Sequence, residues 1–143
     1  MAPDINSLPD EAAPMPEQFS GRMTLTLADW DYMAISSGTG YMFKIATTTP
    51  EGRTIRAKAN WYPESVVSQD EGKKTANRIS MSCIWKPLFK LAGLEKDSYP
   101  EYSARALGQF LENITGPEHA PITFDAMVQE DDRGFMEVKR IYA

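Results

Sequence analysis

The sequence of 143 residues contains a single cysteine, Cys83, and a single histidine, His119. One cysteine cannot form an internal disulfide, which is typical of a chain that folds in a reducing compartment such as the cytoplasm. One histidine excludes zinc sites built from several histidines, and no motif around it supports a catalytic triad. We therefore expect a binding protein rather than an enzyme, with no metal ion and no cofactor.

Long apolar runs are also missing. No segment approaches the roughly 20 apolar residues that a membrane helix needs. The first residues lack the basic and apolar regions of a secretory signal, so we expect a cytoplasmic protein without a membrane partner. A hydrophobic content of 42% and a charged content of 24% are ordinary for a globular chain, and the length suits one domain.

The net charge of −5 argues against a simple basic nucleic-acid binder. The charge is unevenly distributed along the chain. Residues 1–20 hold four acids and no base, and residues 100–143 hold eight acids and four bases. Residues 21–62 hold five bases and three acids, and residues 63–99 hold six bases and five acids. Positive charge is thus concentrated in the middle of the chain, where a local positive groove can form.

Residues 1–20 also contain four prolines and few bulky apolar side chains. Such a segment cannot bury enough apolar surface to fold, which predicts a flexible acidic arm ahead of one domain at residues 21–143. An alternative role for the arm is a docking peptide or an acidic mimic of a nucleic-acid strand.

Residues 40–62 show the clearest pattern in the chain. Apolar and polar residues alternate on both sides of a turn at residues 49–52, which predicts a β-hairpin with one buried face and one wet face. Pro50 suits an early turn position and Gly52 can adopt a positive φ. The phase places Trp61 in the core. The wet face carries three basic side chains, Lys44, Arg56 and Lys58, with aromatic side chains expected close by; an ordinary solvated sheet surface is the alternative.

Alternation also predicts a first strand at about residues 22–29, with Trp30 and Tyr32 following its end. A second hairpin is expected near the end of the chain. Its strands, residues 122–128 and 135–143, flank a tight turn that contains glycine.

Two helical regions are expected between the hairpins. Residues 74–92 have an apolar stripe, and Pro87 removes a backbone hydrogen bond, which predicts a kink or two consecutive short helices. For the second helix, Ser98 is the candidate N-cap and residues 116–117, Gly-Pro, form the end.

The predicted order is three strands, a helical segment and two strands. Strands with one apolar face must bury it, and closing a small barrel removes exposed edges. The fold class is therefore α+β, mainly β: a five-stranded oligonucleotide-binding (OB)-like barrel with a helical insertion between strands 3 and 4. In such a barrel the ligand runs over strands 2 and 3, which here form the basic hairpin.

The turn of the last hairpin, residues 130–134, contains three acids and one base. An acidic rim would repel a phosphate backbone or confine it to the other side of the barrel. Carboxylates can also bind a hard cation, but the spacing of an EF-hand is missing. Acids next to one another in a turn are usually just solvated, so we predict no metal site here.

Three segments, together with the element order, resemble phage-encoded single-stranded-DNA-binding proteins and related replication–recombination accessory proteins. The segments are IRAKANWY, KPLFKLAGL and the last 33 residues, LENITGPEHAPITFDAMVQEDDRGFMEVKRIYA. In that group a hairpin strand ends in an Asn-Trp or Trp-Asn pair, here Asn60-Trp61, and a helix ends near Ala-Gly-Leu, here residues 92–94.

The resemblance covers roughly residues 40–143. It implies an OB-like barrel, strand binding and a part in DNA replication or recombination in the cytoplasm of an infected cell; it implies no particular site residues. The chain departs from bacterial-type single-strand binders because it ends in VKRIYA, without a Gly-rich acidic tail. As protein partners we consider replication proteins of the phage or its host and further copies of the chain.

The function we expect is binding of single-stranded DNA without sequence specificity, through aromatic stacking and contacts of Lys and Arg with phosphates. The pattern suits RNA as well as DNA. The alternative is an acidic phage module that binds or inhibits a host protein, and a virion component is a third hypothesis. The candidate nucleic-acid-binding residues are Lys44, Arg56, Lys58, Lys73 and Lys74 for phosphates, and Trp30, Tyr32, Tyr41 and Tyr62 for bases.

Overall fold

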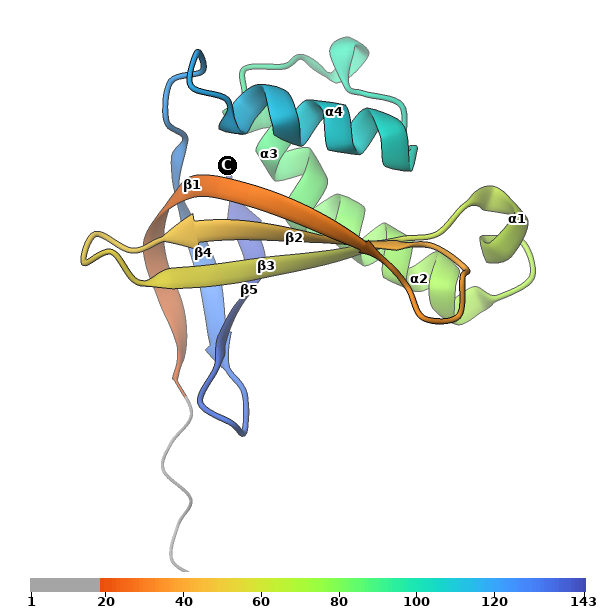
Figure 1. Ribbon diagram of the computed structural model, residues 1–143, viewed down its shortest axis with the longest axis horizontal. Coiled ribbons are helices and arrows are strands. Elements are labelled where there is room, and N and C mark those ends of the chain that lie inside the picture. Colours follow the sequence, from red (N-terminus) through yellow and green to blue (C-terminus); the bar gives the residue numbers. More distant parts are fainter. Residues whose placement is uncertain (1–18) are drawn as a thin grey trace, which may run out of the picture.

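The computed structural model describes residues 19–143. Five strands form a closed barrel in the order β1-β2-β3-β5-β4 (Figure 1). Neighbouring strands are antiparallel except β3 and β5, which are parallel. The predicted five-stranded barrel is therefore confirmed as a closed, mixed barrel. The strands are β1 (Ser20–Ala34), β2 (Tyr41–Thr48), β3 (Thr54–Trp61), β4 (Thr123–Glu130) and β5 (Met136–Tyr142).

Strand β1 pairs with two different strands along its length. Residues 20–26 pair with β4, and residues 26–34 pair with β2. The register shifts around Ala28, and such a bulge bends a strand and increases its twist. The predicted first strand was too short, because pairing with β2 extends β1 through Trp30 and Tyr32. Beyond residue 28 the second edge of β1 has no strand partner among residues 19–143.

Within residues 19–143, the helical segments all lie between β3 and β4 in the chain. Helices α2, η2 and α3 follow one another without a break, and η2 is a single π-helical stretch. The expectation of a kink or two short helices at Pro87 is met by two α-helices joined through this wider turn. A proline ring collides with the carbonyl four residues earlier in a regular helix, and a π-turn relieves that contact. The segments are α1 (Glu64–Val67), α2 (Glu71–Ser80), η2 (Met81–Trp85), α3 (Lys86–Leu91), η3 (Lys96–Ser98) and α4 (Ala104–Thr115).

Helix α4 begins later than the sequence predicted. Its N-cap is Ser103, whose Oγ accepts a hydrogen bond of 3.2 Å from the N–H of Ala106. The prediction of Ser98 was wrong, because Ser98 ends the 3-10 turn η3 and Tyr99 is extended. A residue that precedes proline, as Tyr99 precedes Pro100, is biased away from helical backbone. The predicted end at Gly116 is confirmed.

The core lies between the inner face of the barrel and the helices. Leu25 and Ile45 are fully buried inside the barrel, and Trp85 and Phe89 are buried from the helical side. The rings of Phe43 and Trp85 meet edge to face, with centroids 5.3 Å apart. Burial of each such side chain stabilises the fold by about 1.5–3 kcal/mol. This inward alternation forces the intervening side chains of β2 and β3 to face outwards.

Tyr102 connects the end of β3, helix α2 and the chain that enters α4. Its hydroxyl donates to the backbone oxygen of Asn77 at 3.2 Å, and its own backbone oxygen accepts from Nε1 of Trp61 at 3.3 Å. The Asn77 side chain in turn hydrogen-bonds both the N–H and the C=O of Tyr62. Trp61, predicted in the core, is partly buried and packs against it. Burial raises the pKa of Tyr102 to about 12.

The predicted acidic arm lies outside the described residues except for its last two. Ser20 begins β1, and the carbonyl of Phe19 accepts a 2.7 Å hydrogen bond from the N–H of Glu130. The barrel therefore starts one residue before the predicted boundary at residue 21. In the described part of the chain, no helix has the length and apolar character needed to cross a membrane.

The raised pKa of Tyr102 predicts a loss of stability in alkali. Between the ordinary value of 10.0 and about 12, the unfolded chain has lost this proton while the folded chain keeps it. The free energy of unfolding should therefore fall as pH rises through that window. Tyr102→Phe should reduce this fall, and at neutral pH should cost about 1 kcal/mol for the lost hydrogen bond.

Urea denaturation at neutral pH and across the alkaline window measures both effects. Tyr32→Phe, on an exposed ring, is the matched control. If Tyr102→Phe and Tyr32→Phe both lose as much free energy of unfolding in alkali as the wild type does, Tyr102 is not the group responsible for the loss.

Candidate nucleic-acid interface

Three predicted phosphate ligands, Lys44, Arg56 and Lys58, lie on the outer face of β2 and β3. Lys44 stands directly opposite Lys58 in the strand register, and Arg56 stands opposite Ala46. Arg56 and Lys58 are exposed, and Lys44 is half-buried. The inward alternation of β2 and β3 thus brings three cations together on one surface.

Two acids of β1 complete this surface. Asp31 pairs with Lys44 in the register, and Asp29 pairs with Ala46. Among residues 19–143, no ion pair within 4.0 Å involves any of the three cations. Like charges directly opposite each other on neighbouring strands are destabilising, so an anion bound between the lysines would relieve their repulsion. The basic hollow, about 470 Å³, is lined by Asp29, Trp30, Asp31, Lys44, Ala46, Arg56 and Lys58.

Asp29 and Asp31 also hydrogen-bond the backbone of β1. The N–H of Trp30 donates to Oδ1 of Asp29 at 2.8 Å, and the N–H of Tyr32 donates to Oδ1 of Asp31 at 2.7 Å. These N–H groups belong to the part of β1 that has left β4. An unpaired strand edge is a template for association with another strand. The two carboxylates therefore occupy donors that would otherwise be open to such pairing.

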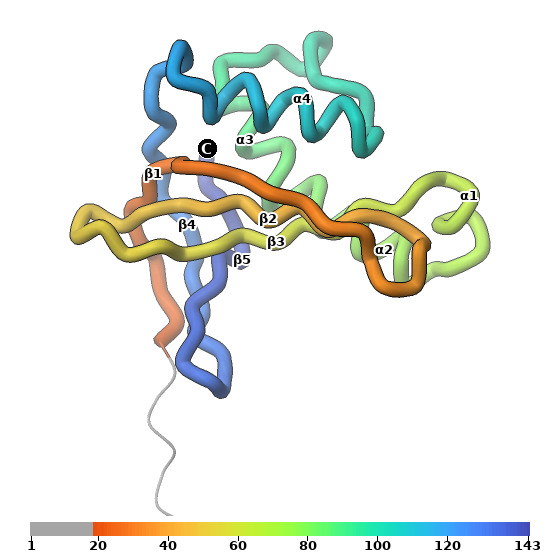
Figure 2. Tube along the Cα trace, viewed as in Figure 1, coloured from red at the N-terminus to blue at the C-terminus, as the bar shows by residue number. Residues whose placement is uncertain are grey.

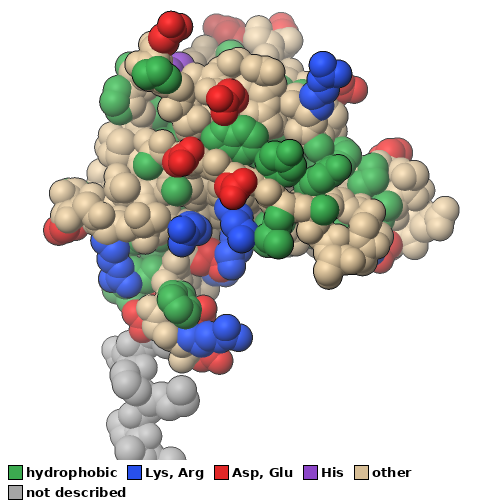
Figure 3. Space-filling view, viewed as in Figure 1, with side chains coloured by type: hydrophobic (Ala, Val, Ile, Leu, Met, Phe, Trp, Pro, Cys, Tyr) green, Lys and Arg blue, Asp and Glu red, His purple; other side chains and the backbone are tan. Residues whose placement is uncertain are grey.

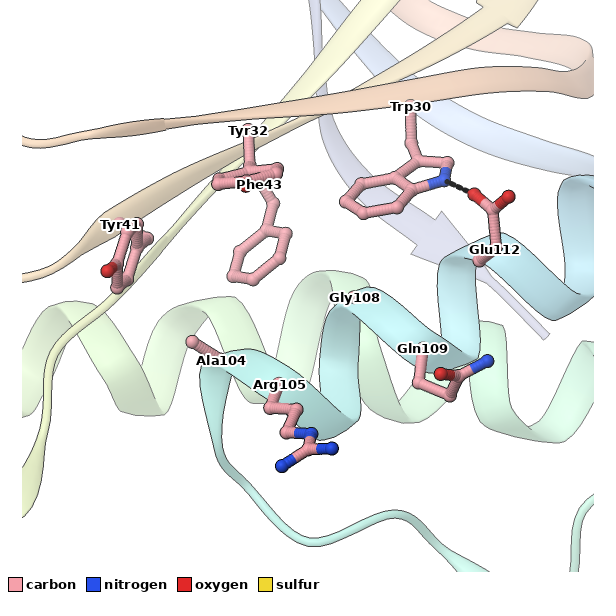
Figure 4. Close-up of a pocket in the computed structure, with 9 residues that line it drawn as sticks. All are labelled: Trp30, Tyr32, Tyr41, Phe43, Ala104, Arg105, Gly108, Gln109 and Glu112. Carbon is pink, nitrogen blue, oxygen red and sulfur yellow. Dashed lines mark hydrogen bonds between the residues drawn. The ribbon is translucent and has the colours of Figure 1, made fainter.

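The predicted stacking residues Trp30, Tyr32 and Tyr41 face the other side of the sheet. Trp30 pairs with Ile45 and Tyr32 pairs with Phe43, so their rings lie on the same face as these buried residues. Figure 4 shows the rings projecting from the strands towards α4, and Figure 2 shows α4 running alongside β1. The aromatic groove, about 510 Å³, is lined by Trp30, Tyr32, Tyr41, Phe43, Ala104, Arg105, Gly108, Gln109 and Glu112.

Three aromatic rings of this groove form a row, which continues to Trp61 beyond its lining. Centroid distances are 6.0 Å from Trp30 to Tyr32, 6.1 Å from Tyr32 to Tyr41 and 6.3 Å from Tyr41 to Trp61. Tyr32 is 57% exposed and Tyr41 is 38% exposed. Exposed aromatic faces in a row are the surface on which the bases of a single strand can stack.

Helix α4 holds Trp30 in place. Nε1 of Trp30 donates to Oε2 of Glu112 at 3.0 Å (Figure 4). Gly108 faces Trp30, and a Cβ atom there would lie 3.4 Å from Cη2 of Trp30, an ordinary contact distance. Sequence reasoning missed these residues and the polar neighbours Arg105 and Gln109. The helical pattern of α4 identified its buried row, and no local signal shows which polar residues face β1.

Three predicted residues, Tyr62, Lys73 and Lys74, lie apart from both surfaces. Tyr62 is half-buried, and the Nζ of Lys73 lies 5.6 Å from the centroid of its ring. Lys73 also pairs with Asp70, the N-cap of α2, at 3.7 Å. Lys74 is exposed on α2 and lines a different hollow. The structure therefore separates these residues from the other candidates.

In the acidic turn between β4 and β5, Asp131 stabilises the turn through backbone hydrogen bonds. Oδ1 of Asp131 accepts from the N–H groups of Arg133 and Phe135, each at 2.9 Å. Gly134 adopts a φ of 83°, which closes the turn. Within residues 19–143, no three or more His, Cys, Asp or Glu side chains are grouped so that they could hold a metal ion.

Figure 3 shows the charged and apolar side chains on this face of the molecule. Lys and Arg side chains gather over the β2–β3 region, hydrophobic side chains form a patch beside them, and acidic side chains lie between the two. This agrees with the register, which places the two aspartates at the edge that separates the basic hollow from the aromatic groove.

No family model, curated protein or solved structure matches the chain. Its function must therefore be inferred from its own residues and their arrangement.

Gly108 lies inside α4, where a glycine costs about 1 kcal/mol relative to alanine. Because the added methyl group would make only an ordinary contact with Trp30, Gly108→Ala should raise the free energy of unfolding by about that amount. Urea denaturation measures the change. Gly134→Ala is the contrasting control and should destabilise, since its positive φ disfavours alanine. A destabilised Gly108→Ala would show that α4 and β1 pack more tightly than described.

Proposed function

We propose that the protein binds single-stranded nucleic acid without sequence specificity, in a binding role rather than a catalytic one. The observation that carries this proposal is the combination of three cations on β2 and β3, which have no ion-pair partner among residues 19–143, and a row of partly exposed rings on the opposite face of the same sheet. The strand order of the barrel is consistent with an OB-like fold, in which strands 2 and 3 form the ligand surface.

The basic hollow supplies the phosphate contacts. Lys44, Arg56 and Lys58 are within one surface on β2 and β3. Each phosphate contact with a single strand lowers the slope of log K against log salt by about 0.7, so three contacts give a slope of about −2.

The aromatic groove supplies the base contacts. Tyr32 and Tyr41 expose the largest part of their rings, and Trp30 is fixed by Glu112. Stacking of one base on an aromatic ring contributes about 1–3 kcal/mol and tolerates every base, because every base has a π-face. This accounts for binding without sequence specificity.

The bound strand must cross the edge of β1, because the cations and the rings lie on opposite faces of it. Only one strand's width separates the two surfaces, since no other strand within residues 19–143 pairs with the outer edge of this part of β1. Asp29 and Asp31 lie at this edge and repel phosphates. We therefore propose that the phosphates stay over Lys44 and Lys58 while the bases turn over the edge onto Tyr32.

This function fits the resemblance of the motifs to phage proteins that bind single-stranded DNA. On that basis we propose a role in phage DNA replication or recombination, with replication proteins as partners. An acidic module that binds a host protein remains the alternative, and it requires no affinity for nucleic acid.

Tryptophan fluorescence titration with oligothymidylate, at low and high salt, tests the proposal. The wild type should bind tightly at low salt and weakly at high salt. Lys44→Gln combined with Lys58→Gln should reduce the salt slope by about 1.4. Tyr32→Ala should weaken binding by roughly 5- to 150-fold, the range that corresponds to about 1–3 kcal/mol.

Two conservative controls accompany these variants. Tyr32→Phe keeps the stacking face and should bind as the wild type does, and Lys96→Gln removes an exposed lysine from outside both surfaces. Absence of quenching at low salt would rule the function out in favour of the protein-binding alternative. Equal competition by duplex DNA would contradict single-strand preference.

A further inference from the structure

Most of the helical stretch that follows the first hairpin carries charge of one sign only. Residues 72–94 contain five bases and no acid, in a chain with a net charge of −5. These residues span nearly all of α2, η2 and α3. Of the five cations, Lys73 is paired with Asp70, and the other four are exposed. Those four are Lys74, Arg78, Lys86 and Lys90.

The π-turn η2 keeps these cations on one side of the helix. A step of four residues in an α-helix rotates about 40° around the axis, so sixteen residues would carry Lys90 about 160° away from Lys74. A π-turn holds roughly one more residue than an α-turn and rotates the following residues back by about 100°. The turn that accommodates Pro87 thus also aligns the two halves of the cation row.

The positions of the side chains agree with this calculated rotation. One hollow of about 330 Å³ is lined by Lys74, Arg78 and Lys86, and a second of about 320 Å³ is lined by Lys86 and Lys90. Ser82 and Lys86 line both hollows, so the two adjoin. We define the basic stripe as the cations that line them, namely Lys74, Arg78, Lys86, Lys90 and Arg140 of β5.

The stripe is almost free of opposing charge. Glu64 is the single acidic side chain among the linings of the two hollows. In the described part of the chain, no ion pair within 4.0 Å involves a member of the stripe. Five cations with one acidic side chain among them, within the described residues, favour a polyanionic ligand.

The stripe is linked to the row of rings through Tyr102. The row of rings ends at Trp61, whose Nε1 donates to the backbone oxygen of Tyr102, and Tyr102 lines the first hollow of the stripe. On this route a longer strand would pass Trp61 and Tyr102 between the groove and Lys74.

We propose that the basic stripe is a second phosphate-binding track, which engages strands longer than the barrel surface can hold. The inference rests on the proposed function and extends it. Cations four residues apart on a helix advance by about 6 Å, a step similar to the separation of neighbouring phosphates in an extended strand. A membrane surface is a weaker candidate, since a helix that lies on lipid inserts an apolar face and this helix buries Ile84, Trp85 and Leu88 in the core.

Salt-dependent binding of two oligothymidylates tests the track. One, of about 8 nucleotides, fits a single barrel surface, and the other, of about 30 nucleotides, exceeds it. On the long strand, Lys86→Gln should reduce the salt slope by about 0.7, and Lys86→Gln combined with Lys90→Gln by about 1.4. On the short strand both variants should match the wild type. Lys44→Gln combined with Lys58→Gln should reduce the salt slope on both the short and the long strand. Lys96→Gln should leave the slope unchanged on both strands.

The outcomes separate the two proposals. If the wild type binds both strands and the stripe variants keep its slope on the long one, the track does not exist and the barrel function stands. If the wild type binds neither strand, both proposals fail. If the stripe variants lose affinity for phosphatidylserine vesicles while keeping the wild-type slope on the long strand, the stripe serves a membrane and the track is rejected.

Discussion

The double pairing of β1 is the constraint on which the rest of the structure depends. Its first half pairs with β4 and closes the barrel, and its second half pairs with β2 alone. The bulge at Ala28 allows one continuous strand to do both, because it bends the chain where the partner changes. The second half therefore stands out as a thin edge, with a basic hollow on one face and an aromatic groove on the other.

Strand geometry explains why cations and rings are divided between two faces. Successive side chains of a strand point to opposite sides, so the aspartates of β1 share a face with Lys44 while Trp30 and Tyr32 share a face with the core. The two aspartates at this edge have a structural role. They accept hydrogen bonds from backbone N–H groups of β1 that pair with no other strand in the described part of the chain. Helix α4 then converts the ring face into a groove and holds Trp30 through Glu112.

Local concentration of charge reconciles an acidic chain with the anionic ligand that we propose. The positive side chains lie on the β2–β3 surface and along the α2–α3 helices, whereas the turn between β4 and β5 is acidic. At physiological ionic strength, exposed charges more than about 8 Å apart are largely screened from each other, so the net charge of −5 does not decide what each surface binds. The π-turn before Pro87 contributes here, because one local adjustment both accommodates a proline and aligns the helical cations.

The sequence by itself determined both hairpins, the outward cations of β2 and β3, the end of α4 and a closed barrel, because alternation and turn residues act between neighbours in the chain. It misplaced the start of α4 at Ser98, ended β1 too early and grouped the rings with the cations. Only the tertiary structure decided that Trp30 lies on the same face of the sheet as the core. The same is true of its hydrogen bond with Glu112, which is 82 residues away in the sequence. Register between distant strands and the seating of a helix depend on packing of the whole core, which no local pattern encodes.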